Sequence, residues 1–375
     1  MKYMGSKRAM LQNGLGELLT REVRGAKRFA DLFAGSSAVA NHVAQKFDVT
    51  VLAFDLQRYS VALAEAVLCR SEAINPETIG DAWIERARSR VKSVRIPTSS
   101  HLTHATVRKL REWCERQDRF PITRAYGGHY FSPRQAIWLD ALRSELPKQK
   151  DSRAVALASL VHAASQCAAA PGHTAQPFQP TRTAKPFLKE AWERSVTDYA
   201  HHALRSLAPQ FARRLGNAEV GNANKVAESL REGDVAFIDP PYSGVHYSRF
   251  YHVLETVVLG KCKSVSGVGR YPDPEYRPRS KYSTKTESAE ALDDLLKTVS
   301  SKGAQAILTF PDHECSNGLS GEMVRDIART YFAIREMCVK SRFSTLGGPS
   351  ANGMEDSGRK ARRNADELIL VLDPK

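Results

Sequence analysis

The segment FIDPPY, residues 237–242, places an acid, two prolines and an aromatic ring side by side. The apolar run before Asp239 predicts a strand, so this carboxylate should emerge at the carboxyl edge of a sheet, where open α/β folds put their active sites. Pro240 and Pro241 fix the backbone and set the direction of the local carbonyl groups. If Asp239 and the Pro240 carbonyl accept both hydrogens of an aromatic amine, its nitrogen lone pair can point at an electrophilic methyl group, while Tyr242 stacks on the ring. The alternative is a rigid turn that only ends a strand.

A second group of candidates lies in FADLFAGSSAV, residues 29–39, and at Asp55. Gly35 stands where a predicted strand gives way to a helix, and Asp55 ends the next strand about 20 residues further on. In a doubly wound sheet this spacing brings a backbone turn against a nucleoside-bearing ligand and aims the acid at its ribose hydroxyls. An ordinary strand-to-helix turn, with Asp55 as a helix N-cap, is the alternative interpretation.

The glycine turn also indicates which kind of ligand it suits. It lacks the full G-x-G-x-x-G pattern, and pyrophosphate binding needs several backbone N–H groups at close approach. A ligand without phosphates, such as S-adenosylmethionine, tolerates serines in this turn. The positive sulfonium of S-adenosylmethionine favours nearby acids and aromatic faces, which Asp31, Phe33 and Asp55 supply.

The elements that position these residues are those of an α/β fold. Residues 29–70 read as a βαβα unit that opens a parallel sheet. Residues 75–215 instead show long, charged segments of helical period without βαβ alternation. Among these predicted helices lie two loops of unusual composition, RAYGGHYFS at 124–132 and PGHTAQPFQPTRTAKPF at 171–187.

Strand patterns return in the last third of the chain. They occur at 218–223, 234–241 and 304–310, which predicts that the sheet is resumed there. Near the C-terminus, the apolar segments 332–343 and 365–372 flank a stretch rich in Gly, Ser and Arg, which predicts an antiparallel pair with a long loop.

Charge and length bound the function. The 375 residues give room for two domains. The formal net charge of +14, with 55 Lys and Arg against 41 Asp and Glu, favours a polyanionic partner such as nucleic acid. A solvated basic surface without such a partner is the alternative.

Cysteine usage and hydropathy indicate the compartment. The six cysteines are scattered, with no C-x-x-C pair and no zinc-like spacing to histidines, so we expect a reducing environment and no metal. No apolar leader follows the N-terminus and no run of about 18 uncharged apolar residues occurs, so neither export nor a membrane span is expected. The sequence predicts a cytoplasmic protein.

Taken in order, KYMGSKR at 2–8, FAGSS at 33–37, Asp55 and DPPY at 239–242 resemble the motifs of the Dam-like, D12 class DNA adenine-N6 methyltransferases. The resemblance implies a Rossmann-like S-adenosylmethionine-dependent methyltransferase sheet. It further implies a catalytic domain made of two parts, 1–74 and 216–375, and an inserted, mainly helical target-recognition region at 75–215.

The resemblance assigns roles by position. Lys7, with its neighbours, borders the methionine end of the cofactor, Asp55 its ribose and Asn222 its adenine, whereas Asp239, Pro240, Pro241 and Tyr242 act on the target adenine. The cofactor-binding candidates are Tyr3, Met4, Lys7, Asp31, Phe33, Gly35, Ser36, Asp55, Asn222 and Asp239. For Lys7, a surface lysine in a basic N-terminus is the alternative.

Two positions depart from the family pattern. Ser37 replaces the second glycine of F-x-G-x-G, and Asp31 with Leu32 stands where the family more often has Glu-Pro. These departures concern the cofactor turn and leave the D-P-P-Y segment untouched.

The function implied is site-specific transfer of a methyl group from S-adenosylmethionine to adenine N6 in double-stranded DNA, with base flipping and without a metal. A cognate restriction endonuclease is a candidate partner. A cytosine-N4 or RNA methyltransferase of the same fold, and a non-catalytic DNA-binding relic, are alternatives. A nicotinamide-dependent dehydrogenase is disfavoured because the sequence lacks the glycines that bind its cofactor's phosphates. A C5-cytosine methyltransferase is disfavoured because the sequence has no Pro-Cys dipeptide to supply the nucleophile.

Contacts to DNA are expected on four stretches. The basic aromatic segment 263–285 and the cluster 358–363 should lie along phosphates, whereas loops 124–132 and 171–187 should read bases. Mobile solvated loops, and core packing of Phe178, are the alternatives. The candidates are Gln176, Phe178, Gln179, Arg182, Arg270, Arg279, Lys281, Arg359 and Arg362.

Overall fold

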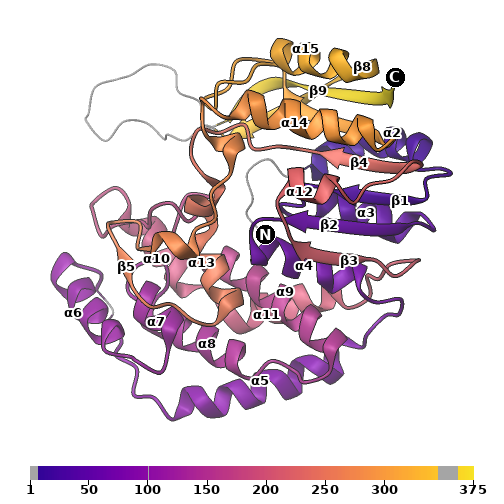
Figure 1. The fold of residues 1–375 in the computed structure, drawn as a ribbon. Coiled ribbons are helices and arrows are strands. Elements are labelled where there is room, and N and C mark those ends of the chain that lie inside the picture. The colour runs from indigo at the N-terminus through magenta and orange to yellow at the C-terminus, as the bar shows by residue number, and fades with distance from the viewer. Residues whose placement is uncertain (1–6, 100, 345–361) are drawn as a thin grey trace.

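The protein is described from a computed structural model that covers residues 7–99, 101–344 and 362–375. A seven-stranded sheet of order β3-β2-β1-β4-β7-β9-β8 occupies one half of the molecule (Figure 1). Its strands are β1 (Arg28–Asp31), β2 (Thr50–Asp55), β3 (Asn217–Val220), β4 (Asp234–Ile238), β7 (Gln305–Pro311), β8 (Phe332–Ser344) and β9 (Arg362–Pro374).

Five of these strands run parallel, from β3 through β2, β1 and β4 to β7. β9 is antiparallel to both β7 and β8. The mixed α/β architecture with a mostly parallel sheet, and the antiparallel pair near the C-terminus, therefore confirm the sequence predictions at this level.

Helices cover both faces of the sheet, so the central strands are apolar on both sides. Phe237 packs in the core of one face and Ile238 in that of the other, as the two-residue period of a strand requires. On the face of Phe237 lie α1 (Arg8–Gln12), α2 (Leu15–Glu22), α3 (Ala38–Lys46) and α4 (Arg58–Leu68). On the face of Ile238 lie α12 (Ala223–Ala227), α14 (Ser288–Ser301) and α15 (Gly321–Tyr331).

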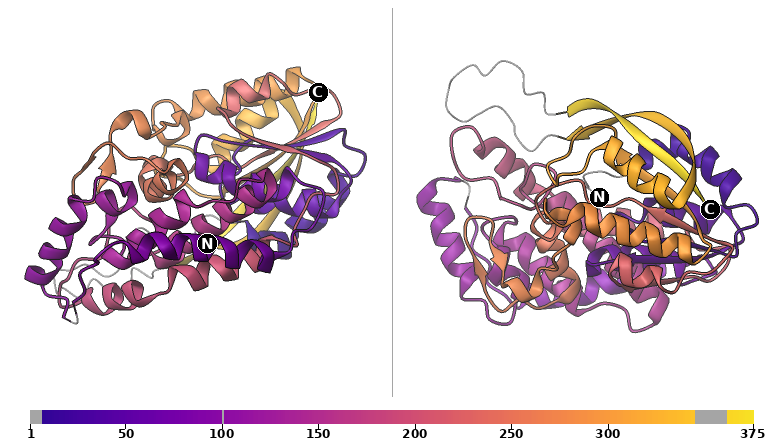
Figure 2. Two further views of the ribbon diagram at one scale, coloured as in Figure 1. Left: turned by 90° about the horizontal axis from the view of Figure 1, so that it is seen from below. Right: turned by 45° about the horizontal axis from the view of Figure 1, so that its top comes forward.

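Residues 76–207, here called the helical region, form the other half of the molecule and extend away from one end of the sheet (Figure 2). Between β2 and β3 the described residues form helices, loops and one isolated bridge, from Gly127 to Phe131. The helices are α5 (Pro76–Lys92), α6 (His104–Glu115), α7 (Pro121–Tyr126), α8 (Pro133–Ser144), α9 (Lys150–Cys167), α10 (Lys185–Glu193) and α11 (Val196–Leu207).

Local sequence accounts for where α8 begins. The Ser132 side chain accepts a hydrogen bond from the backbone N–H of Gln135, the Gln135 side chain reaches back to the N-cap, and Pro133 occupies the first turn.

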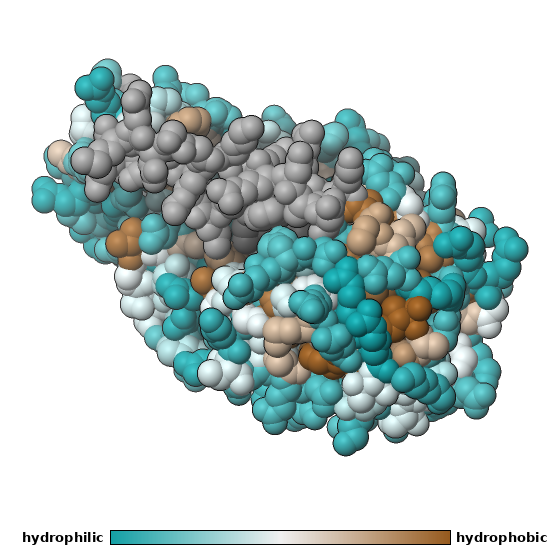
Figure 3. All heavy atoms as spheres, turned by 90° about the horizontal axis from the view of Figure 1, so that it is seen from above, coloured by the Kyte–Doolittle hydropathy of each residue, from teal (hydrophilic) through white to brown (hydrophobic). Residues whose placement is uncertain are grey.

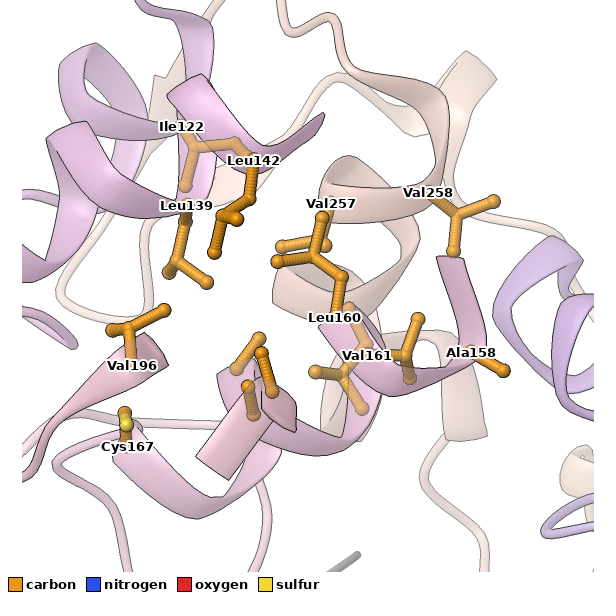
Figure 4. Close-up of a cluster of buried hydrophobic side chains, with 14 of the residues drawn as sticks. Ile122, Leu139, Leu142, Ala158, Leu160, Val161, Cys167, Val196, Val257 and Val258 are labelled. Atoms are coloured by element: carbon orange, nitrogen blue, oxygen red, sulfur yellow. The ribbon is translucent and has the colours of Figure 1, made fainter. Parts of the chain in front are cut away.

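The core of the helical region also receives residues from outside it. Ile122, Leu139 and Val161 meet Val257 of α13 (Tyr247–Leu259), a helix that follows β4 in the chain (Figure 4). α4 contributes to this core as well, through Tyr59 and Leu63. The helical region and the sheet therefore share continuous apolar packing through α4 and α13, and the predicted division at 75–215 remains a proposal.

Residues 263–285, here called the basic segment, form short elements after α13. These are β5 (Val265–Ser266), β6 (Tyr271–Pro272) and the 3-10 turns η1 (Pro274–Tyr276) and η2 (Lys281–Ser283). Where the described residues form the face seen in Figure 3, hydrophilic side chains predominate and apolar ones appear as separate patches. Within the described residues, no helix has the length and apolar character needed to cross a membrane.

Ser37 occupies a left-handed backbone conformation, φ 57° and ψ 22°, at the N-cap of α3. A side chain in this conformation costs roughly 1–2 kcal/mol, which explains why glycine suits the position. The buried Ser37 Oγ donates to the carbonyl of Ser60 at 3.2 Å. Such a bond contributes about 1 kcal/mol, so it offsets much of the strain and ties the glycine turn to α4.

We predict that Ser37→Gly changes the free energy of unfolding by less than about 1 kcal/mol, because strain and hydrogen bond are lost together. Ser37→Ala should destabilise by about 1 kcal/mol, because it keeps the strain and loses the bond. Urea denaturation of both variants measures this order. A larger loss for the glycine variant than for the alanine variant would contradict the account.

Candidate active site

A pocket of about 960 Å³, open solvent at its mouth included, lies at the carboxyl ends of β1, β2 and β4. We call it the edge pocket. Its lining includes Lys7, Asp31, Phe33, Gly35, Ser36, Asp55, Asn222, Asp239, Pro240, Pro241, Tyr242, Tyr247, Pro278, Ser280 and Tyr282. The D-P-P-Y segment and the glycine turn, predicted separately from the sequence, thus face one cavity.

Asp55 binds the glycine turn directly. Its Oδ2 accepts from the backbone N–H of Gly35 at 2.9 Å, and its Oδ1 from that of Gln57 at 2.9 Å. Gly35 has φ 50°, which favours glycine there. The N-cap of α4 is Gln57, so Asp55 does not have the alternative N-cap role. Burial raises the pKa of the Asp55 carboxyl.

Asp31 brings a second acid to the edge pocket. It is buried, and its Oδ1 accepts from the backbone N–H of Phe33 at 3.3 Å. Burial, together with the neighbouring carboxylates of Asp239 and Asp55, raises the pKa of Asp31 to about 8, although the backbone N–H of Phe33 opposes the shift. Three acids therefore converge in the pocket, which favours a ligand group of positive charge.

Asp239 is held from two sides. Thr309 of β7 donates its hydroxyl to Asp239 Oδ1 at 2.9 Å, and Lys7 Nζ lies 3.0 Å from the same oxygen. Burial raises the pKa of Asp239 to about 6, although the Lys7 ammonium and the Thr309 hydroxyl oppose the shift. The carboxylate is therefore mostly ionised at neutral pH.

Lys7 is buried and is not a surface lysine, the alternative given by the sequence. Its ammonium also pairs with Glu367 of β9. Burial lowers the pKa of Lys7, but the carboxylates of Asp239 and Glu367 outweigh burial and raise it overall. Lys7 thus lies at Asp239, the predicted catalytic carboxylate, as well as at the predicted cofactor side of the edge pocket.

The turn after Asp239 is fixed by Asn317, which is buried. Its Nδ2 donates to the carbonyls of Pro241 at 2.9 Å and Tyr282 at 3.0 Å. Its Oδ1 accepts from the backbone N–H of Leu319 at 3.3 Å. Sequence reasoning missed Asn317, because a single asparagine in a loop carries no periodicity or motif.

Tyr282 is a second pocket residue that the sequence did not single out. It is buried, and its ring meets that of Phe33 edge to face at 5.1 Å between centroids. Its hydroxyl donates to Asn224 Oδ1 at 2.7 Å. The aromatic character of the basic segment was the available signal, but that signal was interpreted as a DNA contact.

Glu255 of α13 binds the start of α4 beside the edge pocket. Its carboxylate accepts from the backbone N–H of Tyr59 at 3.1 Å, in the first turn of α4. Burial raises the pKa of Glu255 to about 7, with the backbone N–H groups of Tyr59 and Arg58 opposing. The helix that follows the D-P-P-Y segment is thereby bound to the helix that follows Asp55.

The remaining cofactor candidates lie as follows. Asn222 lines the edge pocket and caps α12, since its Oδ1 accepts from the backbone N–H of Asn224 at 3.1 Å and of Lys225 at 3.4 Å. Ser36 lines the pocket beside Gly35. Tyr3 and Met4 lie outside the described residues.

The basic segment is anchored on the two loops of the helical region. Tyr130 donates its hydroxyl to the carbonyls of Thr174 at 2.6 Å and Gly269 at 2.9 Å. Tyr271 donates to the carbonyl of Ala175 at 2.7 Å. Loops 124–132 and 171–187 and the basic segment therefore meet, and Pro278 and Ser280 of that segment form part of the edge pocket.

The DNA candidates divide into three groups. Gln176, Arg182, Arg279 and Lys281 are exposed. Phe178 and Gln179 are half-buried: Phe178 lies 5.7 Å from the ring of Phe187, and Gln179 Oε1 accepts from Arg111 at 3.0 Å. Arg359 lies outside the described residues, and Arg362 is the first residue of β9.

Arg270 differs from the expectation of a phosphate contact. Its guanidinium donates to the carbonyls of Ala125 at 2.8 Å and Arg124 at 3.1 Å and pairs with Glu115 at 2.9 Å. Its side chain is 15% exposed, so these intramolecular bonds occupy most of it. Charge alone did not reveal this, because the partners lie far away in the sequence.

Comparison with known proteins adds independent information. The model of the D12 class N6 adenine-specific DNA methyltransferases matches residues 3–117 and 171–269, which include both the glycine turn and the D-P-P-Y segment. Modification methylase StsI of Streptococcus sanguinis is 24% identical over 311 residues, covering 80% of this chain and 42% of its own. Modification methylase LlaI of Lactococcus lactis subsp. lactis is 24% identical over 310 residues, covering 80% and 44%.

A relative of more similar length also matches. The type II methyltransferase M.CviAII of Paramecium bursaria Chlorella virus 1 is 26% identical over 310 residues, covering 80% of both chains. The chain thus spans less than half the length of the StsI and LlaI methylases and most of the length of M.CviAII.

We predict that Asn317→Ala destabilises the protein by about 1–3 kcal/mol, because one buried and one part-buried carbonyl lose their donor. Urea denaturation measures the change. Asn217→Ala, on the exposed edge strand β3, is the matched control and should stay within about 0.5 kcal/mol of the unsubstituted protein. Equal stability of both variants would show that Asn317 does not hold this turn.

Proposed function

The chain belongs to the D12 class N6 adenine-specific DNA methyltransferase family, and we propose that it transfers a methyl group from S-adenosylmethionine to adenine N6 in double-stranded DNA. The observation that carries the proposal is the edge pocket, in which the segment 239–242 faces the turn 33–37 and Asp55. The target base and the methyl donor would meet there.

The residues of the edge pocket fit S-adenosylmethionine. Asp31, Asp55 and Asp239 supply negative charge for a sulfonium, and among the described residues that line the pocket Lys7 is the one basic side chain, paired with Asp239 and Glu367. When bound, the cofactor supplies an electrophilic methyl group; transfer forms an N–C bond, breaks the C–S bond and releases a proton and S-adenosylhomocysteine. Asp55 would hold the ribose and Asn222 the adenine of the cofactor.

The D-P-P-Y segment would prepare the amine. Asp239 accepts one N6 hydrogen and the Pro240 carbonyl the other, so that the nitrogen lone pair is no longer delocalised into the ring. Thr309 orients the Asp239 carboxylate through its 2.9 Å hydrogen bond. Tyr242 stacks on the adenine, which would have to leave the duplex to reach the pocket.

DNA would lie over the helical region and the basic segment, which we propose as the target-recognition region. Exposed Arg182, Arg279 and Lys281 supply sequence-independent phosphate contacts. Gln176 and Gln179 of loop 171–187 are the proposed base readers, with Phe178 beside them. Arg270 would act through its bonds to Arg124 and Ala125, by holding the basic segment in place.

The biological setting follows from the relatives by analogy. The StsI and LlaI relatives are named as modification methylases and M.CviAII as a type II methyltransferase. We propose that this chain likewise protects DNA in a restriction-modification system, with a cognate restriction endonuclease as partner. Cytosine N4 and RNA are the alternative targets of the same chemistry.

Asp239→Ala should lower the rate of methyl transfer at least about 100-fold, because the amine loses its charged acceptor, while DNA affinity changes less than about threefold. The assay uses labelled S-adenosylmethionine and unmethylated DNA, followed by digestion to nucleosides, and anisotropy for DNA binding. Asp48→Asn, at an exposed carboxylate, is the control and should behave like the unsubstituted protein. Label in N4-methylcytosine, or in RNA only, would reject adenine N6 as the target.

Binding of S-adenosylmethionine should release a proton near pH 7. The free protein holds Asp31 with a pKa of about 8, and a sulfonium favours the ionised form, so the pKa falls on binding. Affinity should therefore decrease as pH falls below about 8, by up to tenfold per pH unit. Calorimetry in two buffers of different ionisation enthalpy counts the protons. Proton uptake, or an Asp31→Asn variant with the same pH dependence, would contradict this assignment.

A further inference from the structure

The oxygen proposed to receive the adenine amine already has two donors. Lys7 Nζ lies 3.0 Å from Asp239 Oδ1, and Thr309 Oγ1 donates to it at 2.9 Å. Lys7 presents N–H groups at the place where the adenine N6 hydrogens are expected. Under the proposed function, the ammonium would occupy the amine's position on this oxygen, and a base that binds there would displace it.

Glu367 offers Lys7 a second partner. One ammonium is shared by the carboxylates of Asp239 and Glu367, and the side chains of Lys7, Asp239 and Glu367 are 6%, 18% and 12% exposed. Glu367 belongs to β9 and is paired with Pro311 of β7 on one side and Val339 of β8 on the other. Its carboxylate is therefore carried by a rigid part of the sheet, two strands from β4, the strand that precedes Asp239.

We propose that Glu367 is a positioning residue for methyl transfer: it keeps Lys7 paired when the target adenine displaces the ammonium from Asp239. This inference rests on the proposed function. In the absence of a base, the Lys7 ammonium neutralises the Asp239 carboxylate and occupies the position that the adenine amine would take. When the base enters, the N6 group takes over Asp239 Oδ1 and the ammonium stays on Glu367.

Electrostatics explains why the second carboxylate matters. A buried ammonium that leaves its carboxylate without another partner is strongly disfavoured, and Glu367 removes this barrier. With Glu367 neutral, Lys7 would bind Asp239 more firmly and compete with the adenine amine. Neutralising Glu367 should therefore lower the rate of methyl transfer and the affinity for DNA more than the affinity for the cofactor.

The charged and titratable groups around Asp239 give the proposal a distinct pH signature. Lys7 comes from the segment before α1, Glu367 from β9, Asp31 from β1 and Tyr242 from the same turn. The Lys7 ammonium lowers the pKa of Asp239, whereas the Glu367 carboxylate raises it. Neutralising Lys7 and neutralising Glu367 should therefore have opposite effects on the acidic limb of the rate profile, the range of low pH in which kcat/KM falls because Asp239 becomes protonated.

The test measures kcat and kcat/KM for methyl transfer to unmethylated duplex DNA from pH 5 to 9, with the full chain. Glu367→Gln should lower kcat at least about tenfold and move the acidic limb of kcat/KM to lower pH. Lys7→Met should move this limb to higher pH. In the double variant, Glu367→Gln should lower kcat no further than Lys7→Met alone, because its effect on the transfer step acts through Lys7. It should still move the acidic limb to lower pH, because the Glu367 carboxylate itself raises the pKa of Asp239.

Several outcomes would overturn the proposal. These are an unshifted acidic limb in Glu367→Gln, shifts in the same direction for both single variants, or losses that multiply in the double variant. If Glu367→Gln does not fold, Glu367→Asp replaces it: the retained charge should leave the limb in place while the shorter side chain lowers kcat, and a shifted limb would refute the inference. Failure of the proposed function is distinguishable, because the unsubstituted protein would then form no N6-methyladenine.

Discussion

The concentration of carboxylates at one edge of the sheet is the constraint on which the rest of the structure depends. Asp31, Asp55 and Asp239 stand at the carboxyl ends of three adjacent parallel strands and meet in one pocket. Like charges at short range raise one another's pKa, and burial adds to the effect. Backbone N–H groups from the glycine turn, the Thr309 hydroxyl and the Lys7 ammonium stabilise this arrangement.

The helical region takes part in this site through packing as well as through its surface. α13 follows the D-P-P-Y segment and buries its side chains among α7, α8 and α9, and Glu255 binds it to the start of α4. The turn at 239–242 and the start of α4, which follows Asp55, are therefore fixed by the same core that supports loops 124–132 and 171–187. A shift of those loops can therefore reach the Asp239 carboxylate through a few packed side chains.

Most of the fold and the outline of the site could be predicted from local patterns in the sequence. The apolar run before Asp239, the strand-to-helix turn at Gly35 and the acid at Asp55 each follow from a few neighbouring residues, and the parallel sheet brings them together. The contacts that hold Asp239 could not be predicted in this way, because Thr309, which donates to Asp239, and Glu367, which pairs with Lys7, come from distant strands. Tertiary contacts also decided the role of Arg270, which the basic segment alone presented as a DNA contact.

A crystal structure of the protein with S-adenosylhomocysteine tests the central claim most directly. The account predicts ribose hydroxyls within hydrogen-bond distance of the Asp55 carboxylate and the homocysteine sulfur facing Asp239 and Tyr242. A ligand whose ribose lies away from Asp55, or whose sulfur lies outside the pocket shared by residues 33–37 and 239–242, would contradict it.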